Sequence, residues 1–144
     1  MEYITDKDLL GIKEEDINFG PIGRIVDTRT YRRPKEEGGR ETALEAFKRV
    51  INYNVKLASD RLPYTELREE ALLMLDKMVQ LKVLPSNRAR WVAGTDVINK
   101  NSLCAFNCST VPINRLKAFS QLFMALMLGA GVGFRVFYRD INQL

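Results

Sequence analysis

The chain has 144 residues, of which 46% are hydrophobic and 28% charged, a composition typical of one soluble globular unit with a single buried core. No apolar run approaches the roughly 20 residues of a membrane helix, and no basic stretch followed by an apolar one begins the chain, so we expect a cytoplasmic protein without a membrane partner. The formal net charge is a mild +4, and the absence of histidine excludes Ser-His and Cys-His catalysis within this chain.

Residues 1–40 carry many turn-forming residues and predict a flexible N-terminal arm with one short extended segment over residues 25–33. This segment overlaps the basic cluster RTYRRPK, which begins at Arg29 and ends at Lys35 and contains Tyr31. Taken alone, the cluster indicates a solvated strand edge more readily than a nucleic-acid site.

Two amphipathic helices are predicted next, over residues 42–57 and from Thr65 to about Leu81. Thr42 and Glu45 have the spacing of a capping box at the start of the first helix. Apolar residues recur at helical spacing in both segments, and the short connection predicts an antiparallel pair. The pattern stops over residues 83–101, which predict a long loop. We therefore expect a helical region with this loop at residues 41–100.

The last segment, residues 101–144, predicts a strand, a helix and a second strand. The first strand covers residues 103–113, the helix is capped by Asn114, and the second strand is the run VGFRVFYR at residues 132–139. This order is a βαβ unit, which favours a parallel strand pair.

Three glycines at alternate positions, Gly129, Gly131 and Gly133, separate this helix from its second strand. A phosphate-binding loop needs its glycines before a helix, where free N–H groups and the positive end of the dipole lie. Here the glycines follow the helix, so the order of elements excludes a phosphate loop. Gly129 is predicted to end the helix in the left-handed conformation, and the other two allow close packing or a flat ligand on the backbone.

The two cysteines, Cys104 and Cys108, are too few for a zinc site, and the sequence indicates no metal. If both lie on one strand, they are separated by roughly 13 Å, given about 3.3 Å per residue, which is too far for a disulfide. Each could therefore be a small buried hydrophobe, or a thiol whose partner comes from elsewhere.

Four segments together resemble a known family: RTYRR (29–33), LPSNRARWVAGTD (84–96), NSLCAFNCSTVPI (101–113) and FMALMLGAGVGFRV (123–136). In this order and spacing, the set is similar to the N-terminal part of a ribonucleotide reductase large chain. It is most similar to the adenosylcobalamin-dependent ribonucleoside-triphosphate reductases, although relatives that use diphosphates remain open. The resemblance covers about residues 24–144.

The resemblance implies an α/β fold in which an N-terminal helical region precedes the first βαβ of a ten-stranded α/β barrel. By its Asn-Cys-Ser context, Cys108 matches the reducing cysteine, which later forms a disulfide with a second cysteine. Ser86 matches a hydroxyl residue that hydrogen-bonds substrate, Asn107 a contact to the ribose, and Gly131 and Gly133 the backbone on which the nucleotide lies. Cys104 is then a packing residue, and Arg88 and Trp91 support the Ser86 loop.

The family's other catalytic cysteines, and the segments that bind most of its adenosylcobalamin, have no counterpart among these residues. The resemblance therefore implies a split subunit or a truncated remnant that is inactive without a second polypeptide carrying the rest of the barrel. It also implies a thioredoxin-like reductant and no direct contact with nucleic acid.

Two alternatives remain open at this point. One is a non-catalytic nucleotide- or nucleic-acid-binding module that uses the Arg29 to Lys35 cluster, whose binding would weaken steeply with salt. The other is a small structural domain with two buried thiols, both of which would resist alkylation until the chain unfolds.

Overall fold

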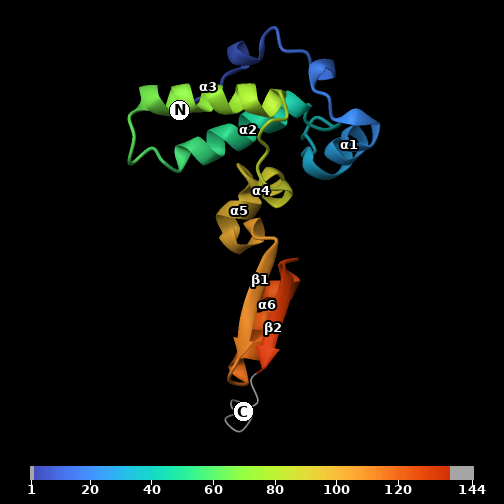
Figure 1. Ribbon diagram of the computed structural model, residues 1–144, viewed down its shortest axis with the longest axis vertical. Helices are drawn as coiled ribbons and strands as arrows, with labels where there is room; N and C mark the ends of the chain where they lie inside the picture. The colour runs from blue at the N-terminus through green and yellow to red at the C-terminus, as the bar shows by residue number, and fades with distance from the viewer. Residues whose placement is uncertain (1, 137–144) are drawn as a thin grey trace. The chain divides into compact units, whose positions relative to one another are not determined.

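The computed structural model describes residues 2–136, which belong to two compact units, residues 1–94 and 95–144 (Figure 1). The first 40 residues belong to the same unit as the predicted helical region, and the division falls at Gly94 rather than near residue 100. Among the described residues, no helix is long and apolar enough to cross a membrane.

The first unit is built on two helices, α2 (Ala43–Lys56) and α3 (Tyr64–Val79), which lie side by side and antiparallel as predicted (Figure 1). The capping box is present, because the Thr42 hydroxyl accepts from the Glu45 N–H at 3.1 Å and Glu45 Oε2 accepts from the Thr42 N–H at 2.7 Å. Their apolar faces form the core, which contains Phe47, Ile51, Leu67, Ala71, Leu75 and Met78.

The N-terminal segment is not the flexible arm that we expected. It forms two 3₁₀ turns, Asp6–Leu9 and Glu14–Asp16, and its residues Tyr3, Ile4 and Ile17 are buried in the same core. Asn52 of α2 binds this segment, since its side-chain oxygen accepts hydrogen bonds from the N–H groups of Tyr3 and Ile4, both at 2.8 Å. The buried apolar residues of this segment do not recur every 2 or 3.6 residues, so the sequence has no periodic pattern that predicts their packing against the helices.

The predicted extended segment at residues 25–33 is also wrong. The chain is helical there, through α1 (Gly20–Val26) and a π-helical turn (Asp27–Tyr31). Gly20, with a φ of +66°, and Pro21 start this helix, and Asp27 is buried at its end. Tertiary contacts of Asp27 thus override the strand preference of the surrounding Val, Ile and Thr residues.

Residues 83–101 are not one long loop either. They contain two short helices, α4 (Asn87–Val92) and α5 (Asp96–Lys100). Ser86 caps α4, because its hydroxyl accepts from the Ala89 N–H at 3.3 Å. Helices of six and five residues are too short to show an apolar period, so their sequence resembles a loop.

The second unit is the predicted parallel βαβ unit, in which β1 (Cys108–Ile113) and β2 (Gly131–Val136) flank α6 (Lys117–Met127) in sequence. A 3₁₀ turn, Ser102–Ala105, precedes β1, so the strand begins later than predicted. The helix is capped at Leu116 rather than Asn114. The end of the predicted second strand, residues 137–139, lies outside the described residues.

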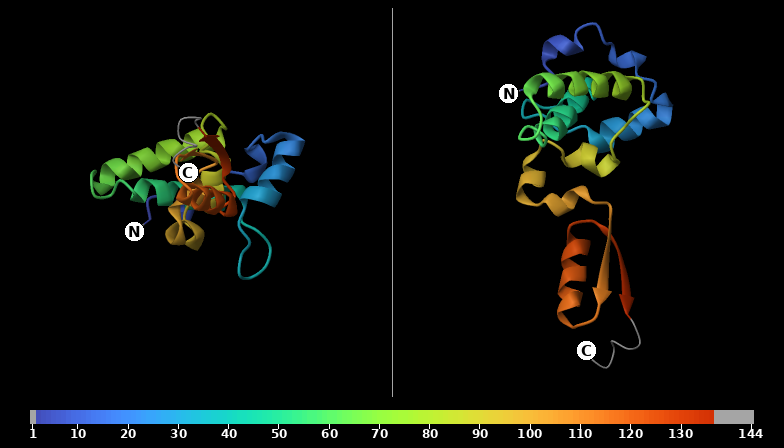
Figure 2. Two further views of the ribbon diagram at one scale, coloured as in Figure 1. Left: turned by 90° about the horizontal axis from the view of Figure 1, so that it is seen from below. Right: turned by 60° about the vertical axis from the view of Figure 1, so that its left-hand side comes forward.

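This unit has one covered face. The helix α6 lies along one face of the β1–β2 pair (Figure 2), where Val111, Ile113 and Ala118 form a small core with Leu122 and Val132 packed against it. The described residues thus form a two-stranded parallel sheet with a helix on one side, and a ten-stranded barrel stays an expectation.

The ion pair between Asp8 and Arg68 in the first unit predicts a loss of stability in acid. Arg68 Nη2 donates to Asp8 Oδ1 at 2.5 Å, and this bond holds the pKa of the Asp8 carboxyl well below its usual range. The ionised carboxylate therefore stabilises the folded state above about pH 4, the ordinary pKa of Asp, and this contribution disappears as the pH falls below it.

Urea unfolding between pH 5 and pH 2.5 measures this effect. We expect the free energy of unfolding of Asp8→Asn to fall less than that of the wild type over this range, by about 1 kcal/mol, the upper end for a partly exposed ion pair. Asp6→Asn is the matched control: it removes an 88% exposed carboxylate from the same turn, whose ion pair with Lys48 at 2.8 Å is screened by water, so its profile should lie close to that of the wild type. Identical pH profiles for all three proteins would contradict the role of Asp8.

Candidate active site

The exposed thiol of Cys108 lies at the start of β1, on the sheet face that α6 does not cover. Successive strand residues alternate between faces, so Cys108 and Thr110 share the face opposite to Val111 and Ile113, which are buried against α6. In the parallel register, Cys108 pairs with Gly131 and Thr110 with Gly133. The strand beside the thiol therefore presents backbone, with no side chain, at both paired positions.

The three glycines have separate structural roles. Gly129 has a φ of +74° and ends α6 as predicted, since its N–H donates to the Leu126 carbonyl at 2.9 Å and the Ala130 N–H donates to the Ala125 carbonyl at 3.2 Å. The Gly131 N–H donates to the Asn107 carbonyl at 2.8 Å, and a Cβ at Gly131 would lie 3.4 Å from that carbonyl oxygen.

Gly133 is in open space, because a Cβ added there would meet no atom within 4 Å. Among the described residues, no close neighbour accounts for this glycine. The two interpretations that the sequence left for it, close packing and a flat ligand against the backbone, both stay predictions.

Asn107 connects the Cys108 strand to the Gly131 strand of this candidate site. The Asn107 carbonyl accepts a hydrogen bond from the Gly131 N–H. Asn107 itself is exposed and directly precedes Cys108. A pocket of about 270 Å³ adjoins this corner and is lined by Phe106, Cys108, Ser109, Ala125, Leu128 and Ala130. The second unit thus brings together Cys108, Gly131 and Gly133 on two adjacent strands, with Asn107 directly before the first strand.

Cys104 is a buried thiol and is not bonded to Cys108. It lies in the 3₁₀ turn before β1, so the separation that we estimated for a continuous strand does not apply. Its Sγ donates to the Val97 carbonyl at 3.8 Å. This position is that of a small packing residue.

The contrast between the two thiols predicts selective alkylation. In the folded chain, we expect iodoacetamide to modify Cys108 and to leave Cys104 unmodified until denaturant is added, because only the Cys108 thiol is exposed. Peptide mass spectrometry after a timed reaction measures both sites in one sample. Equal rates at the two cysteines in the folded state would contradict the buried position of Cys104.

Ser86, the remaining predicted site residue, belongs to the first unit and is described there by itself. It is exposed at the start of α4, with its hydroxyl used as the helix cap. On the same helix, the Trp91 ring contacts two guanidinium groups, with Arg33 at 5.2 Å and Arg88 at 5.9 Å from the ring centroid.

A cluster of buried charges is bonded to α4 through Arg90, and the sequence analysis did not identify it. Asp27 is 2% exposed, and its carboxylate accepts from Arg32 Nε at 2.7 Å and also from Arg90 Nη2. Arg32 Nη1 further donates to Glu14 at 2.6 Å. The sequence signal for this cluster is weak: Asp27 directly follows Ile25 and Val26, and a carboxylate that is buried requires partners.

The same contacts weaken the nucleic-acid alternative. Of the basic residues at positions 29–35, Arg32 is 7% exposed and paired with two carboxylates, and Lys35 donates to Glu45 at 2.7 Å. Arg33 lies over Trp91. These cations are engaged within the protein and do not form a free basic patch.

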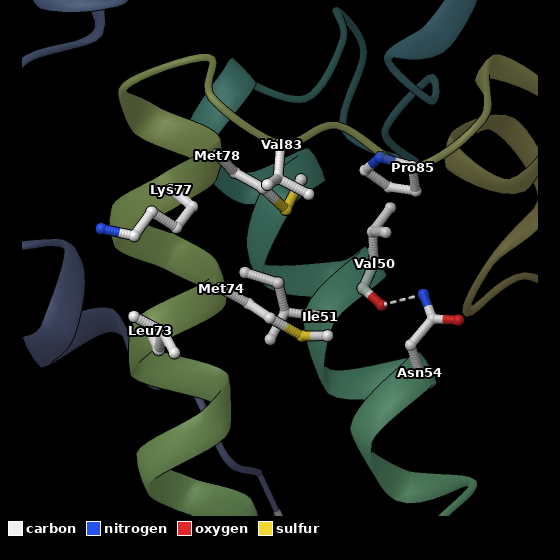
Figure 3. Close-up of a pocket in the computed structure, with 9 residues that line it drawn as sticks. All are labelled: Val50, Ile51, Asn54, Leu73, Met74, Lys77, Met78, Val83 and Pro85. Atoms are coloured by element: carbon white, nitrogen blue, oxygen red, sulfur yellow. Dashed lines mark hydrogen bonds between the residues drawn. The ribbon is translucent and has the colours of Figure 1, made fainter.

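An apolar pocket of about 410 Å³ lies between α2 and α3, next to the segment that leads into Ser86 (Figure 3). Its two polar side chains are already bonded, since Asn54 donates to the Val50 carbonyl at 2.8 Å and Lys77 pairs with Asp76 at 3.0 Å. Met74, Met78, Val83 and Pro85 are among the other lining residues. A nucleotide requires convergent polar groups, so this pocket is not the candidate site.

Several known proteins are similar to this chain. The family described as the ribonucleotide reductase alpha domain matches residues 7–95. An adenosylcobalamin-dependent ribonucleoside-triphosphate reductase of Lactobacillus gasseri is 31% identical over 159 residues, which covers 92% of this chain and 21% of the relative. A protein of Mycobacterium phage D29, to which the same activity is provisionally ascribed, is 37% identical over 122 residues, or 83% of this chain and 17% of its own length.

A crystal structure of a B12-dependent (class II) ribonucleotide reductase is similar over 96% of this chain and 23% of the solved chain, with a TM-score of 0.78 and 29% sequence identity. The chain thus spans about a fifth of the length of these relatives. With a family match over more than half of its residues, the chain belongs to the ribonucleotide reductase alpha family.

Proposed function

We propose that this chain is the N-terminal portion of a ribonucleotide reductase that converts ribonucleoside triphosphates to 2′-deoxyribonucleotides, with Cys108 as a reducing thiol. The observation that carries the proposal is the exposed Cys108 in register with Gly131 on the uncovered face of a parallel strand pair. The adjacent strand has no side chain at the positions paired with Cys108 and Thr110.

In this proposal, Cys108 is one of two thiols that supply the reducing electrons. The C2′–OH bond of the substrate breaks, the oxygen leaves as water, C2′ gains a hydrogen, and the two thiols become a disulfide. Cys104 is the only other cysteine of these 144 residues and is buried in its turn, so the second thiol comes from residues beyond them. These residues belong either to one longer polypeptide or to a second chain, and a thioredoxin-like dithiol restores the pair.

The proposed substrate contacts are those that the family resemblance implies. The nucleotide ribose or base lies against the backbone of Gly131 and Gly133, where the open space at Gly133 admits a flat group. The Asn107 side chain contacts the ribose beside the thiol, and the Ser86 hydroxyl of the first unit donates to the substrate. Ser86 has this donor free, because as a helix cap its oxygen only accepts.

Adenosylcobalamin supplies the radical chemistry of the relatives named after it. The residues described here do not form its cradle. The pocket beside Cys108, at about 270 Å³, is below the roughly 300–1,000 Å³ of pockets for drug-sized ligands, and a corrin is larger than these. We therefore assign cofactor binding mainly to other segments. Two free thiols also suit the reducing cytoplasm.

The test is a reductase assay on the protein purified together with the rest of the reductase, whether this is one polypeptide or two. We expect conversion of ribonucleoside triphosphates to deoxyribonucleotides that requires both adenosylcobalamin and a dithiol. Diphosphates assayed in parallel decide between the two substrate classes. No reduction of either class with cofactor and dithiol present would refute the proposed function.

A further inference from the structure

We propose that Asp27 is a positioning residue for Ser86: its buried carboxylate holds α4 through Arg90 and thereby fixes the position of the Ser86 hydroxyl, a proposed substrate contact. This inference rests on the proposed function, because it takes Ser86 as a substrate contact. All of the residues involved belong to the first unit.

The Asp27 carboxylate joins two guanidinium groups from separate segments. Oδ2 accepts from Arg32 Nε at 2.7 Å, and Oδ1 accepts from Arg90 Nη2. The arginines are 7% and 5% exposed, so neither charge has water to replace a lost partner. Asp27 therefore bonds the turn after α1 to α4 through these two arginines.

Arg90 also links this carboxylate to Ser86. Its N–H donates to the Ser86 carbonyl at 2.9 Å, one turn before it, and its guanidinium lies over the rings of Tyr31 at 5.1 Å and Phe47 at 5.7 Å. A helix of six residues is far too short to be stable alone. Side-chain contacts must therefore hold α4, and with it the Ser86 cap.

The first measurement is amide hydrogen exchange of Asp27→Asn. An amide has nearly the shape of the carboxylate but carries no charge, so Arg90 loses its ion pair whichever way the amide is turned, whereas Arg32 keeps Glu14. We expect exchange over residues 86–93 to become about tenfold faster or more, while that of α3 stays unchanged. Asp8→Asn is the matched control, since it breaks the Asp8–Arg68 pair in the same unit and should leave residues 86–93 unchanged.

The second measurement links this contact to the substrate. In the reductase assay, we expect Asp27→Asn to raise KM about tenfold with a much smaller change in kcat, and to add nothing in a Ser86→Ala background. A purely structural role would lower the amount of active enzyme and leave KM unchanged in both backgrounds. Where Asp27→Asn does not fold, Arg90→Lys tests the same contact, because lysine keeps the charge but lacks the planar fork of donors.

The outcomes separate this inference from the function on which it rests. Unchanged exchange at residues 86–93 overturns the claim that Asp27 holds α4, whatever the enzyme reduces. Faster exchange with additive KM effects overturns the link to Ser86. A wild-type protein that reduces no nucleotide refutes the proposed function and the substrate half of this inference, while the exchange data still decide whether Asp27 holds α4.

Discussion

Cys108→Ser is expected to abolish nucleotide reduction, with a fall in kcat on the order of a thousandfold or more, while substrate affinity stays within about twofold. Serine has nearly the size of cysteine, so the exposed start of β1 and its pairing with Gly131 are kept. A hydroxyl cannot form a disulfide under these conditions, however, and the electrons for the reduction are then missing. The loss should appear in kcat, because the thiol reacts and does not bind.

Cys104→Ser is the matched control for this experiment. It makes the same atomic change four residues earlier, and the new hydroxyl can donate to the Val97 carbonyl as the thiol does. We expect nearly full activity from it. Full activity of Cys108→Ser would refute the reducing role of Cys108, and equal losses in the two variants would indicate a structural effect on the segment before β1. Direct binding of a radiolabelled ribonucleoside triphosphate to each variant completes the comparison.

The parts of the fold that the sequence predicted correctly are those with a strong local signal. The α2 helix has its capping box and a full apolar face, and the glycine that ends α6 lies in the left-handed conformation that its position requires. The parallel pairing of β1 with β2 follows from the order strand, helix, strand. In each case a few neighbouring residues contain the information.

The parts that it missed depend on distant partners. The segment around Asp27 is helical because Arg32 and Arg90 pair with the carboxylate, and Arg90 is 63 positions away. The N-terminal segment docks through Asn52, about 48 positions from Ile4. The candidate site likewise contains residues that the sequence indicated and residues that it did not. The resemblance indicated Cys108 and its glycines, but the buried charges that hold α4 have no spacing that identifies them.

Gly94→Ala is expected to lower the free energy of unfolding of the first unit by about 3 kcal/mol, from left-handed strain of roughly 1–2 kcal/mol and the displacement of charged hydrogen bonds. Gly94 has a φ of +69°, and an added Cβ would lie 2.8 Å from Arg49 Cγ and 3.3 Å from the Arg49 carbonyl oxygen. Neither atom is the free end of a flexible side chain, so the stem of the Arg49 side chain or the backbone must shift.

That shift would break the contacts by which Arg49 holds the end of α4. The Arg49 guanidinium pairs with Glu41 through two bonds of 2.7 and 3.0 Å and donates to the carbonyls of Arg90 and Ala93. With these bonds lost, the last turn of α4 has unsatisfied carbonyls beside a displaced cation. The cost is therefore larger than that of left-handed backbone alone.

Gly39→Ala separates the two contributions. Gly39 has a similar φ of +78°, but a Cβ there meets no atom within 4 Å, so its alanine variant has only the backbone strain, about 1 kcal/mol. Urea unfolding followed by the fluorescence of Trp91, the single tryptophan and a residue of α4, measures both variants in the first unit. Equal destabilisation by the two substitutions would show that Arg49 moves freely and that the end of α4 does not depend on it. A loss for Gly94→Ala larger by about 2 kcal/mol would establish Arg49 as the residue that fixes this end of the helix carrying Ser86.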